Sequence, residues 1–166
     1  EHRVSAYSHN LEPVYADIDS YADGIARRIE EICAATGADQ LVILAHSMGG
    51  LAARAYLRTH GARRVAKLIT LGTPHHGTVT ARLAAGKNGK QMVPGNAWLE
   101  QLNGTALGVP AVSVLSHQDN IVAPQDSSML AGAKNLSVSG MGHISMPFSR
   151  RIQEIALAEI QLLFGP

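Results

Sequence analysis

Residues 41–57 constrain the fold of this chain more than any other stretch. Four large apolar residues, Leu41–Leu44, lead directly into the polar, glycine-rich sequence Ala45-His46-Ser47-Met48-Gly49-Gly50, and a helix-forming segment follows at once. An apolar run of this length is typical of a strand that is buried on both faces, as in a parallel sheet. The stretch therefore predicts a strand over 41–45, a sharp turn at Ser47 and a helix over 48–60.

The turn matches the pattern G-x-S-x-G, with Ala45 in place of the first glycine. A turn of this kind needs small residues on either side of the serine because the strand and the helix nearly touch, and Ala45 and Gly49 meet that need. It would hold the Ser47 hydroxyl above the sheet at a helix N-terminus, where free N–H groups favour a developing anion. We interpret Ser47 as a nucleophile; an ordinary helix N-cap is the alternative.

Helical and strand patterns alternate along the rest of the chain. Strands are expected at 3–7, 65–71, 110–115 and 135–138, and helices from Asp19-Ser20 to Gly37 and from about residue 149. In the first helix Ala22, Ile25, Ile29, Ile32 and Cys33 form the apolar face, and Arg27, Arg28, Glu30 and Glu31 form a solvated one. Residues 78–108 have an irregular pattern. This order predicts one α/β domain over 1–166, a mainly parallel sheet flanked by helices on both faces.

Four polar clusters follow predicted strands: Ser47, the loop 72–77, Asp119 and His143. The carboxyl ends of parallel strands share one edge of a sheet, so these clusters are expected to converge there. A serine hydroxyl needs a general base, and an imidazole, with a pKa of about 6.5, suits that task. A carboxylate must then orient the imidazole and stabilise its cation. The order Ser, Asp, His along the chain predicts a catalytic triad of Ser47, Asp119 and His143.

The chain has eight histidines, so the base has to be selected among them. His143 alone follows the last strand on a glycine-flanked loop that can reach back to Ser47. Asp119 lies two or three residues past a strand, where the acid is expected, whereas Asp126 better suits the start of a helix. His46 is expected to pack at the pocket or to support a loop. The N–H group of Met48, directly after the nucleophile, is expected to donate to an oxyanion.

Composition excludes several other classes of function. A net charge of +1 and few aromatic residues argue against a nucleic-acid partner. No apolar run approaches the roughly 20 residues of a transmembrane helix. Cys33 is the single cysteine, so it can form neither an internal disulfide nor a cysteine metal cluster, and we expect it to be a buried apolar residue. The remaining histidines lack the spacing of metal ligands, so neither metal nor cofactor is predicted.

Together, these motifs resemble those of bacterial triacylglycerol lipases and esterases of the α/β-hydrolase superfamily. The resemblance runs from about residue 3 to 163 and is carried by Ala45–Gly50, Leu71–Gly77, Asp119–Pro124 and Gly142-His143. It implies a serine hydrolase that cleaves carboxylic esters of small molecules or lipids through an acyl-enzyme. It also implies that Thr73, Pro74 and His75 flank the substrate pocket and that 78–108 forms a cap or lid. Family members are often secreted or attached to the cell envelope, which slightly favours that location.

Two departures from the family pattern carry expectations of their own. Ile144-Ser145-Met146-Pro147 follows His143 without a carboxylate, so no calcium site is expected. The chain begins about where the fourth strand of the family would begin, so we expect a fold that is reduced at the N-terminus, as in a partial chain. The loop that supplies the second oxyanion donor is then missing, and strand 3–7 could move in beside strand 41–45. The alternatives are a thioesterase or amidase with the same triad, or a catalytically weak binding module; no oligomeric state is favoured.

Overall fold

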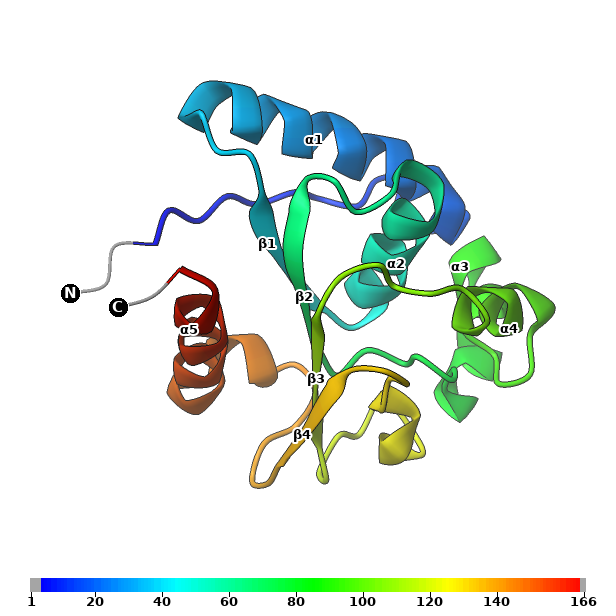
Figure 1. Ribbon diagram of the computed structural model, residues 1–166. Coiled ribbons are helices and arrows are strands. Elements are labelled where there is room, and N and C mark those ends of the chain that lie inside the picture. Colours follow the sequence, from blue (N-terminus) through cyan, green and yellow to red (C-terminus); the bar gives the residue numbers. More distant parts are fainter. Residues whose placement is uncertain (1–3, 165–166) are drawn as a thin grey trace.

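The computed structural model of the protein describes residues 4–164. Four parallel strands form one sheet in the order β1-β2-β3-β4 (Figure 1). The strands are β1 (Leu41–His46), β2 (Val65–Leu71), β3 (Ala111–Ser116) and β4 (Lys134–Val138). The α-helices are α1 (Tyr21–Thr36), α2 (Met48–His60), α3 (Gly86–Gln91), α4 (Ala97–Asn103) and α5 (Arg150–Phe164). The 3-10 helices are η1 (Ile18–Ser20), η2 (Val79–Leu83), η3 (Gln125–Ser128) and η4 (Met146–Phe148).

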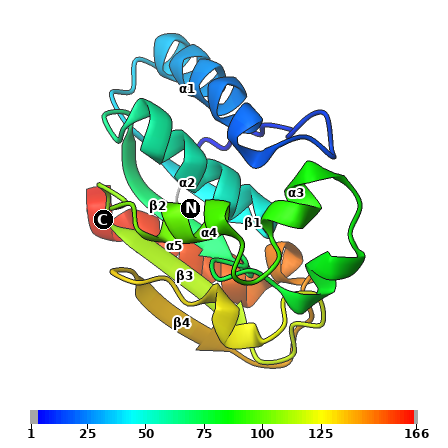
Figure 2. The same ribbon diagram turned by 90° about the vertical axis from the view of Figure 1, so that its right-hand side faces the viewer.

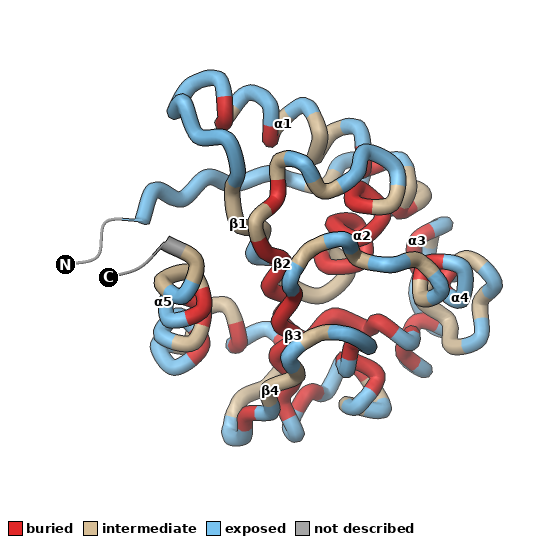
Figure 3. Tube along the Cα trace, viewed as in Figure 1, coloured by how far each residue is buried: buried red, intermediate tan, exposed pale blue. Residues whose placement is uncertain are grey.

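Helices cover both faces of the sheet, which confirms the predicted α/β class (Figures 1 and 2). On one face, apolar residues of β2 and β3 such as Ile69 and Val112 pack against Ile152 and Ala156 of α5. On the other face the apolar residues of α1 and α2 pack against β1 and β2, and Cys33 lies buried there as expected. β2 and β3 therefore run through the buried centre of the molecule (Figure 3).

The position of β1 corrects one prediction. β1 pairs with β2 alone and lies at the edge of the sheet, so it is not buried on both faces: Leu44 is 53% exposed, and Ala45 is its one buried residue. The strand predicted over 3–7 is also wrong for residues 4–7, which form no strand, while Arg3 lies outside the described residues. Val4 and Tyr7 are exposed. A weak alternation with two exposed apolar residues offers little burial to stabilise a strand.

Residues 78–108 are more regular than their sequence pattern indicates, because η2, α3 and α4 lie within them. The Asn96 side chain caps α4 by accepting a hydrogen bond from the N–H of Trp98 at 2.9 Å. Leu99 and Leu102 of α4 pack in one apolar cluster with Leu51 of α2. A cap or lid role for this segment stays a prediction. Within residues 4–164, no helix is both long and apolar enough to cross a bilayer.

A buried ion pair fastens α5 to the sheet. The Lys67 ammonium of β2 donates to both the backbone carbonyl and the carboxylate of Glu159, at 2.8 and 3.1 Å, and Lys134 of β4 donates to the other carboxylate oxygen. Lys67 and Glu159 are buried. The hydrogen bonds from Lys134 and Lys67 outweigh the effect of burial and lower the pKa of Glu159 below its usual 4.5.

Glu159→Gln is expected to destabilise the protein by about 3 kcal/mol at pH 7, since it leaves a buried ammonium without its counter-charge. That corresponds to a fall in Tm of about 6–12 °C. Because the folded pKa of Glu159 is lowered, its ionised form adds stability above about pH 4.5, and this is lost as the pH falls through the folded pKa. Thermal unfolding at pH 7 and pH 3.5 should show the difference between variant and wild type shrinking at the lower pH.

The matched control is Glu154→Gln, which removes the exposed pair with Arg150 on the same helix. It should change the free energy of unfolding by less than about 0.5 kcal/mol. An equal loss in the two variants would contradict the special role of the buried pair.

Candidate active site

Ser47 is the single residue between β1 and α2, and its backbone is strained. Its φ is 56° and its ψ is −132°, and it is the one non-glycine residue with a positive φ in the part of the chain that the structure describes. A serine in this conformation is held there by its surroundings, and such strain clusters at functional sites. Its N–H donates to the carbonyl of Leu71 at 2.9 Å, which ties the turn to the end of β2.

The tight approach of strand, helix and loop falls one residue later than the sequence pattern suggests. A Cβ placed on Gly49 would lie 3.9 Å from the Cβ of Ala45, an ordinary contact. A Cβ placed on Gly50 would come within 2.2 Å of the Thr73 hydroxyl. Gly50 is therefore the residue that must be glycine for the loop after β2 to lie against the start of α2.

Asp119 and His143 form a buried hydrogen-bonded pair at the carboxyl end of the sheet. His143 Nδ1 lies 2.7 Å from Asp119 Oδ2. The other carboxylate oxygen, Oδ1, accepts from the N–H groups of Ile121 and Val122 at 2.9 and 2.7 Å. Since the carboxylate can only accept, Nδ1 carries the proton, and the neutral form of this ring has its lone pair on Nε2, as a general base requires.

The pair of Asp119 and His143 lies beside the Ser47 turn, because the ring of His143 packs against His46, the residue directly before the serine. The rings of His46 and His143 are 4.6 Å apart between centroids. Asp119 occupies Nδ1 of His143, so Nε2, on the opposite side of the ring, is the nitrogen that Asp119 leaves available. No hydrogen bond joins Ser47 Oγ to His143 Nε2 in residues 4–164. Such bonds are often long in an enzyme without substrate and tighten when it binds.

His46 supports the loop of His143, the role that the sequence suggests. Its Nε2 lies 3.0 Å from the backbone carbonyl of His143. Because a carbonyl can only accept, Nε2 carries the proton. Burial and the nearby His143 lower the pKa of His46, so its ring is neutral at pH 7.

The loop residues Thr73, Pro74 and His75 lie inside the protein and not on open space. All three are buried, and the His75 side chain is 0% exposed. Arg54 donates to His75 Nδ1 at 3.2 Å, so Nε2 carries the proton and donates to the Thr70 hydroxyl at 3.1 Å. Burial, then the Arg54 charge, hold the pKa of His75 well below its usual 6.5. His75 is thus a neutral, buried residue that connects Arg54 to Thr70 by hydrogen bonds.

This buried chain of hydrogen bonds continues across the sheet. Thr70 donates to Ser113 at 3.0 Å, and Ser113 donates to the carbonyl of Ser128 at 2.6 Å. Arg54 also donates to the carbonyl of Leu102 in α4 at 2.9 Å, and burial lowers its pKa to about 10. None of these residues was singled out from the sequence. The available signal was a hydroxyl within each of two apolar strands, at Thr70 near the end of β2 and at Ser113 within β3.

Gly72 is a further residue that was not singled out from the sequence. Its φ is +53°, and a Cβ there would lie 3.1 Å from Asp119 Oδ2 and 3.2 Å from His143 Nδ1. The glycine at the end of β2 thus leaves room for the hydrogen bond between acid and base. A glycine at the carboxyl end of a strand, at the same sheet edge as the other polar clusters, was the signal.

An open groove of about 1000 Å³ reaches Ser47 along the free edge of β1. His46, Ser47 and Met48 line it, whereas Thr73, Pro74 and His75 do not. Met48 begins α2, so its N–H is among those that a helix leaves without an internal partner. Within residues 4–164 no strand lies on the free side of β1, the side on which strand 3–7 was expected.

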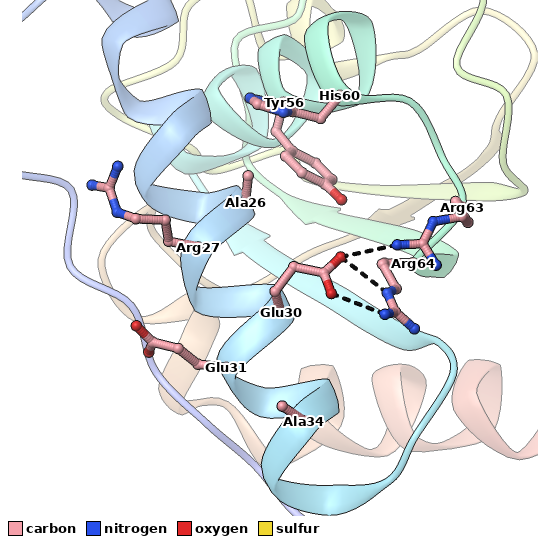
Figure 4. Close-up of a pocket in the computed structure, with 9 residues that line it drawn as sticks. All are labelled: Ala26, Arg27, Glu30, Glu31, Ala34, Tyr56, His60, Arg63 and Arg64. Carbon is pink, nitrogen blue, oxygen red and sulfur yellow. Dashed lines mark hydrogen bonds and ion pairs between the residues drawn. The ribbon is translucent and has the colours of Figure 1, made fainter.

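A second depression, of about 590 Å³, lies between α1 and α2 and is lined by charged residues (Figure 4). The Glu30 carboxylate accepts from Arg64 at 2.9 and 3.0 Å and from Arg63 at 3.3 Å. The hydrogen bond from Arg64 is the main cause of the lowered pKa of Glu30. On the predicted solvated face of α1, Arg27, Glu30 and Glu31 are exposed, as expected, and Arg28 is half-buried. Among residues 4–164, no three His, Cys, Asp or Glu side chains gather as metal ligands would.

Comparison with known proteins agrees with this geometry. A family model described as alpha/beta hydrolase fold matches residues 5–92, just over half of the chain. Triacylglycerol lipases of Pseudarthrobacter phenanthrenivorans and Burkholderia plantarii are each 33% identical over 79 residues, which is 46% of this chain. The match spans 24% and 22% of the length of these two relatives.

Solved structures show the same fold. The mature lipase BlEst2 of Bacillus licheniformis superimposes with a TM-score of 0.76 at 16% identity, over 93% of this chain and 77% of that one. Lipase B of Aspergillus fumigatus superimposes with a TM-score of 0.62 at 23% identity, over 74% of this chain and 34% of that one. At these identities the likeness concerns the arrangement of strands and helices.

Proposed function

Because this chain belongs to the alpha/beta hydrolase fold family, we propose that it is a serine hydrolase that cleaves carboxylic esters through an acyl-enzyme. The observation that carries the proposal is the buried pair of Asp119 and His143 beside the strained Ser47 turn. A tautomer with the proton on Nδ1, next to a serine at a helix N-terminus, suits acyl transfer. The lipase names of the two relatives favour an ester as the substrate.

The proposed reaction has two halves, formation of the acyl-enzyme and its hydrolysis, and the same groups act in both. His143 Nε2 takes the proton of Ser47 Oγ as this oxygen bonds to the ester carbonyl carbon, and the carbonyl oxygen becomes an anion. The N–H of Met48 donates to that oxyanion. When the C–O bond to the alcohol breaks, Nε2 returns the proton to the leaving oxygen. Water then attacks the acyl-enzyme with the same base, releasing the acid and Ser47.

A fluorophosphonate probe tests the proposal, since it bonds covalently to an activated serine. We expect one phosphonyl group per chain, and digestion with mass spectrometry should locate it on Ser47. The variant Ser47→Ala should take up no label. Folded wild-type protein that stays unlabelled, or a label on another serine, would defeat the proposal.

One observation favours a second candidate, a hydrolase-like binding module with weak turnover. Within residues 4–164, no strand lies on the free side of β1 whose following loop could supply a second oxyanion donor. Losing one such donor costs about 10²–10³-fold in kcat. Hydrolysis of a p-nitrophenyl ester that depends on Ser47 would reject this candidate. A thioester or amide substrate would use the same groups, so parallel assays with these substrates define the bond that is cleaved.

A further inference from the structure

His46 is the point at which the loop of the proposed base is joined to the Ser47 turn. On its β3 side, the loop 139–145 is held by Gln118, whose side-chain oxygen accepts from the Gly140 N–H at 2.7 Å, and by Ser116, which donates to the Met141 carbonyl. On the side of the nucleophile, the His46 Nε2–H donates to the His143 carbonyl at 3.0 Å. The two residues are 97 positions apart in sequence.

Two hydrogen bonds position His143, and each sets a different part of its geometry. Asp119 holds Nδ1 at 2.7 Å and so sets the tautomer and the rotation of the ring. That bond alone does not set how far the ring lies from Ser47, because Asp119 belongs to the β3 side of the site. The hydrogen bond from His46 holds the backbone of His143 against the residue directly before the nucleophile. The rings of His46 and His143 pack with their centroids 4.6 Å apart.

We propose that His46 is a positioning residue, which sets the distance between the base and Ser47 by donating a hydrogen bond to the backbone carbonyl of His143. This inference rests on the proposed function for its catalytic consequence. The donor must stay uncharged when His143 takes up a proton, because two cations at this distance would repel each other. The lowered pKa of His46 meets that condition.

Three variants separate the donor from the ring. His46→Phe keeps an aromatic ring and loses the donor, whereas His46→Gln loses the ring and keeps an N–H donor near the place of Nε2. His60→Phe is the matched control, since His60 is an exposed histidine at the far end of α2, paired with Asp23. We expect His46→Phe to lower kcat for a p-nitrophenyl ester about tenfold with KM unchanged, since one hydrogen bond is worth about that factor. His46→Gln should recover most of the loss, and His60→Phe should match wild type.

A readout that needs no turnover keeps the inference separate from the proposed function. The Nδ1 proton of His143, bonded to Asp119, should exchange with water faster in His46→Phe than in wild type or His46→Gln, as measured by proton NMR. If wild type takes up no fluorophosphonate and this exchange order still holds, the proposed function fails and the positioning role stands. If His46→Phe equals wild type in kcat and in exchange, or if His46→Gln is as impaired as His46→Phe, the positioning role through the donor is overturned.

Discussion

Asp119→Asn is expected to lower kcat by about 10⁴-fold while the protein stays folded. The amide oxygen of asparagine can replace Oδ1, which accepts from the N–H groups of Ile121 and Val122. Its NH₂ group then faces His143 Nδ1 in place of Oδ2 and donates to it. Nδ1 must give up its proton, so the proton moves to Nε2, and the lone pair that would accept the Ser47 proton is lost.

The measurement is steady-state hydrolysis of a p-nitrophenyl ester, with circular dichroism as the check on folding. Asp126→Asn is the control, because Asp126 was the competing candidate for the acid and is an exposed residue of η3. It should leave kcat within about twofold of wild type, since surface substitutions away from a site have small effects. A kcat for Asp119→Asn within tenfold of wild type would remove Asp119 from the triad.

Gly72→Ala is expected to reduce kcat/KM about tenfold, although residue 72 carries no reacting group. The new methyl would lie 3.1 Å from Asp119 Oδ2, 3.2 Å from His143 Nδ1 and 3.2 Å from Met146 Sδ, against both atoms of the hydrogen bond between acid and base. The pair must give by a few tenths of an ångström to make room. Because a misplacement of about 1 Å at a catalytic group costs about 10²-fold, this smaller shift is expected to cost about tenfold.

The same change also strains the backbone, since φ at residue 72 is +53°. Gly37→Ala is the control for the backbone strain, because φ at residue 37 is +73° and a Cβ there would meet nothing within 4 Å. Both variants should lose about 1–2 kcal/mol of stability from the left-handed backbone, but Gly37→Ala should keep full activity. Equal activity in the two variants would show that the methyl at residue 72 does not press on the pair.

Much of the fold could be predicted because its signals are local. The buried strands β2 and β3 lie close to their predicted bounds, since runs of apolar residues between turn signals specify them. The order of Ser47, Asp119 and His143 after successive strands was enough to expect them at one edge. The structure confirms the contact between Asp119 and His143, while the role of Ser47 as their partner stays a prediction.

The wrong predictions about burial share one cause. A sequence pattern describes a single segment and does not show which other segments pack against it. The run 41–45 has the composition of a central strand, but β1 lies at the edge with Leu44 53% exposed. The family resemblance placed His75 at the pocket, yet its side chain is buried and bonded to Arg54 and Thr70. Whether a side chain at a strand end faces open space or the interior depends on what packs against it.

The sequence by itself determined the order of the four strands with α1, α2 and α5, the sharp turn at Ser47 and the chemical types available at the sheet edge, because each follows from residues a few positions apart. The tertiary structure alone decided that β1 is an edge strand, that Gly72 borders the bond between Asp119 and His143, and that His46 reaches the His143 carbonyl. These facts depend on contacts between residues as far as 97 positions apart, and the packing of the whole sheet sets such distances.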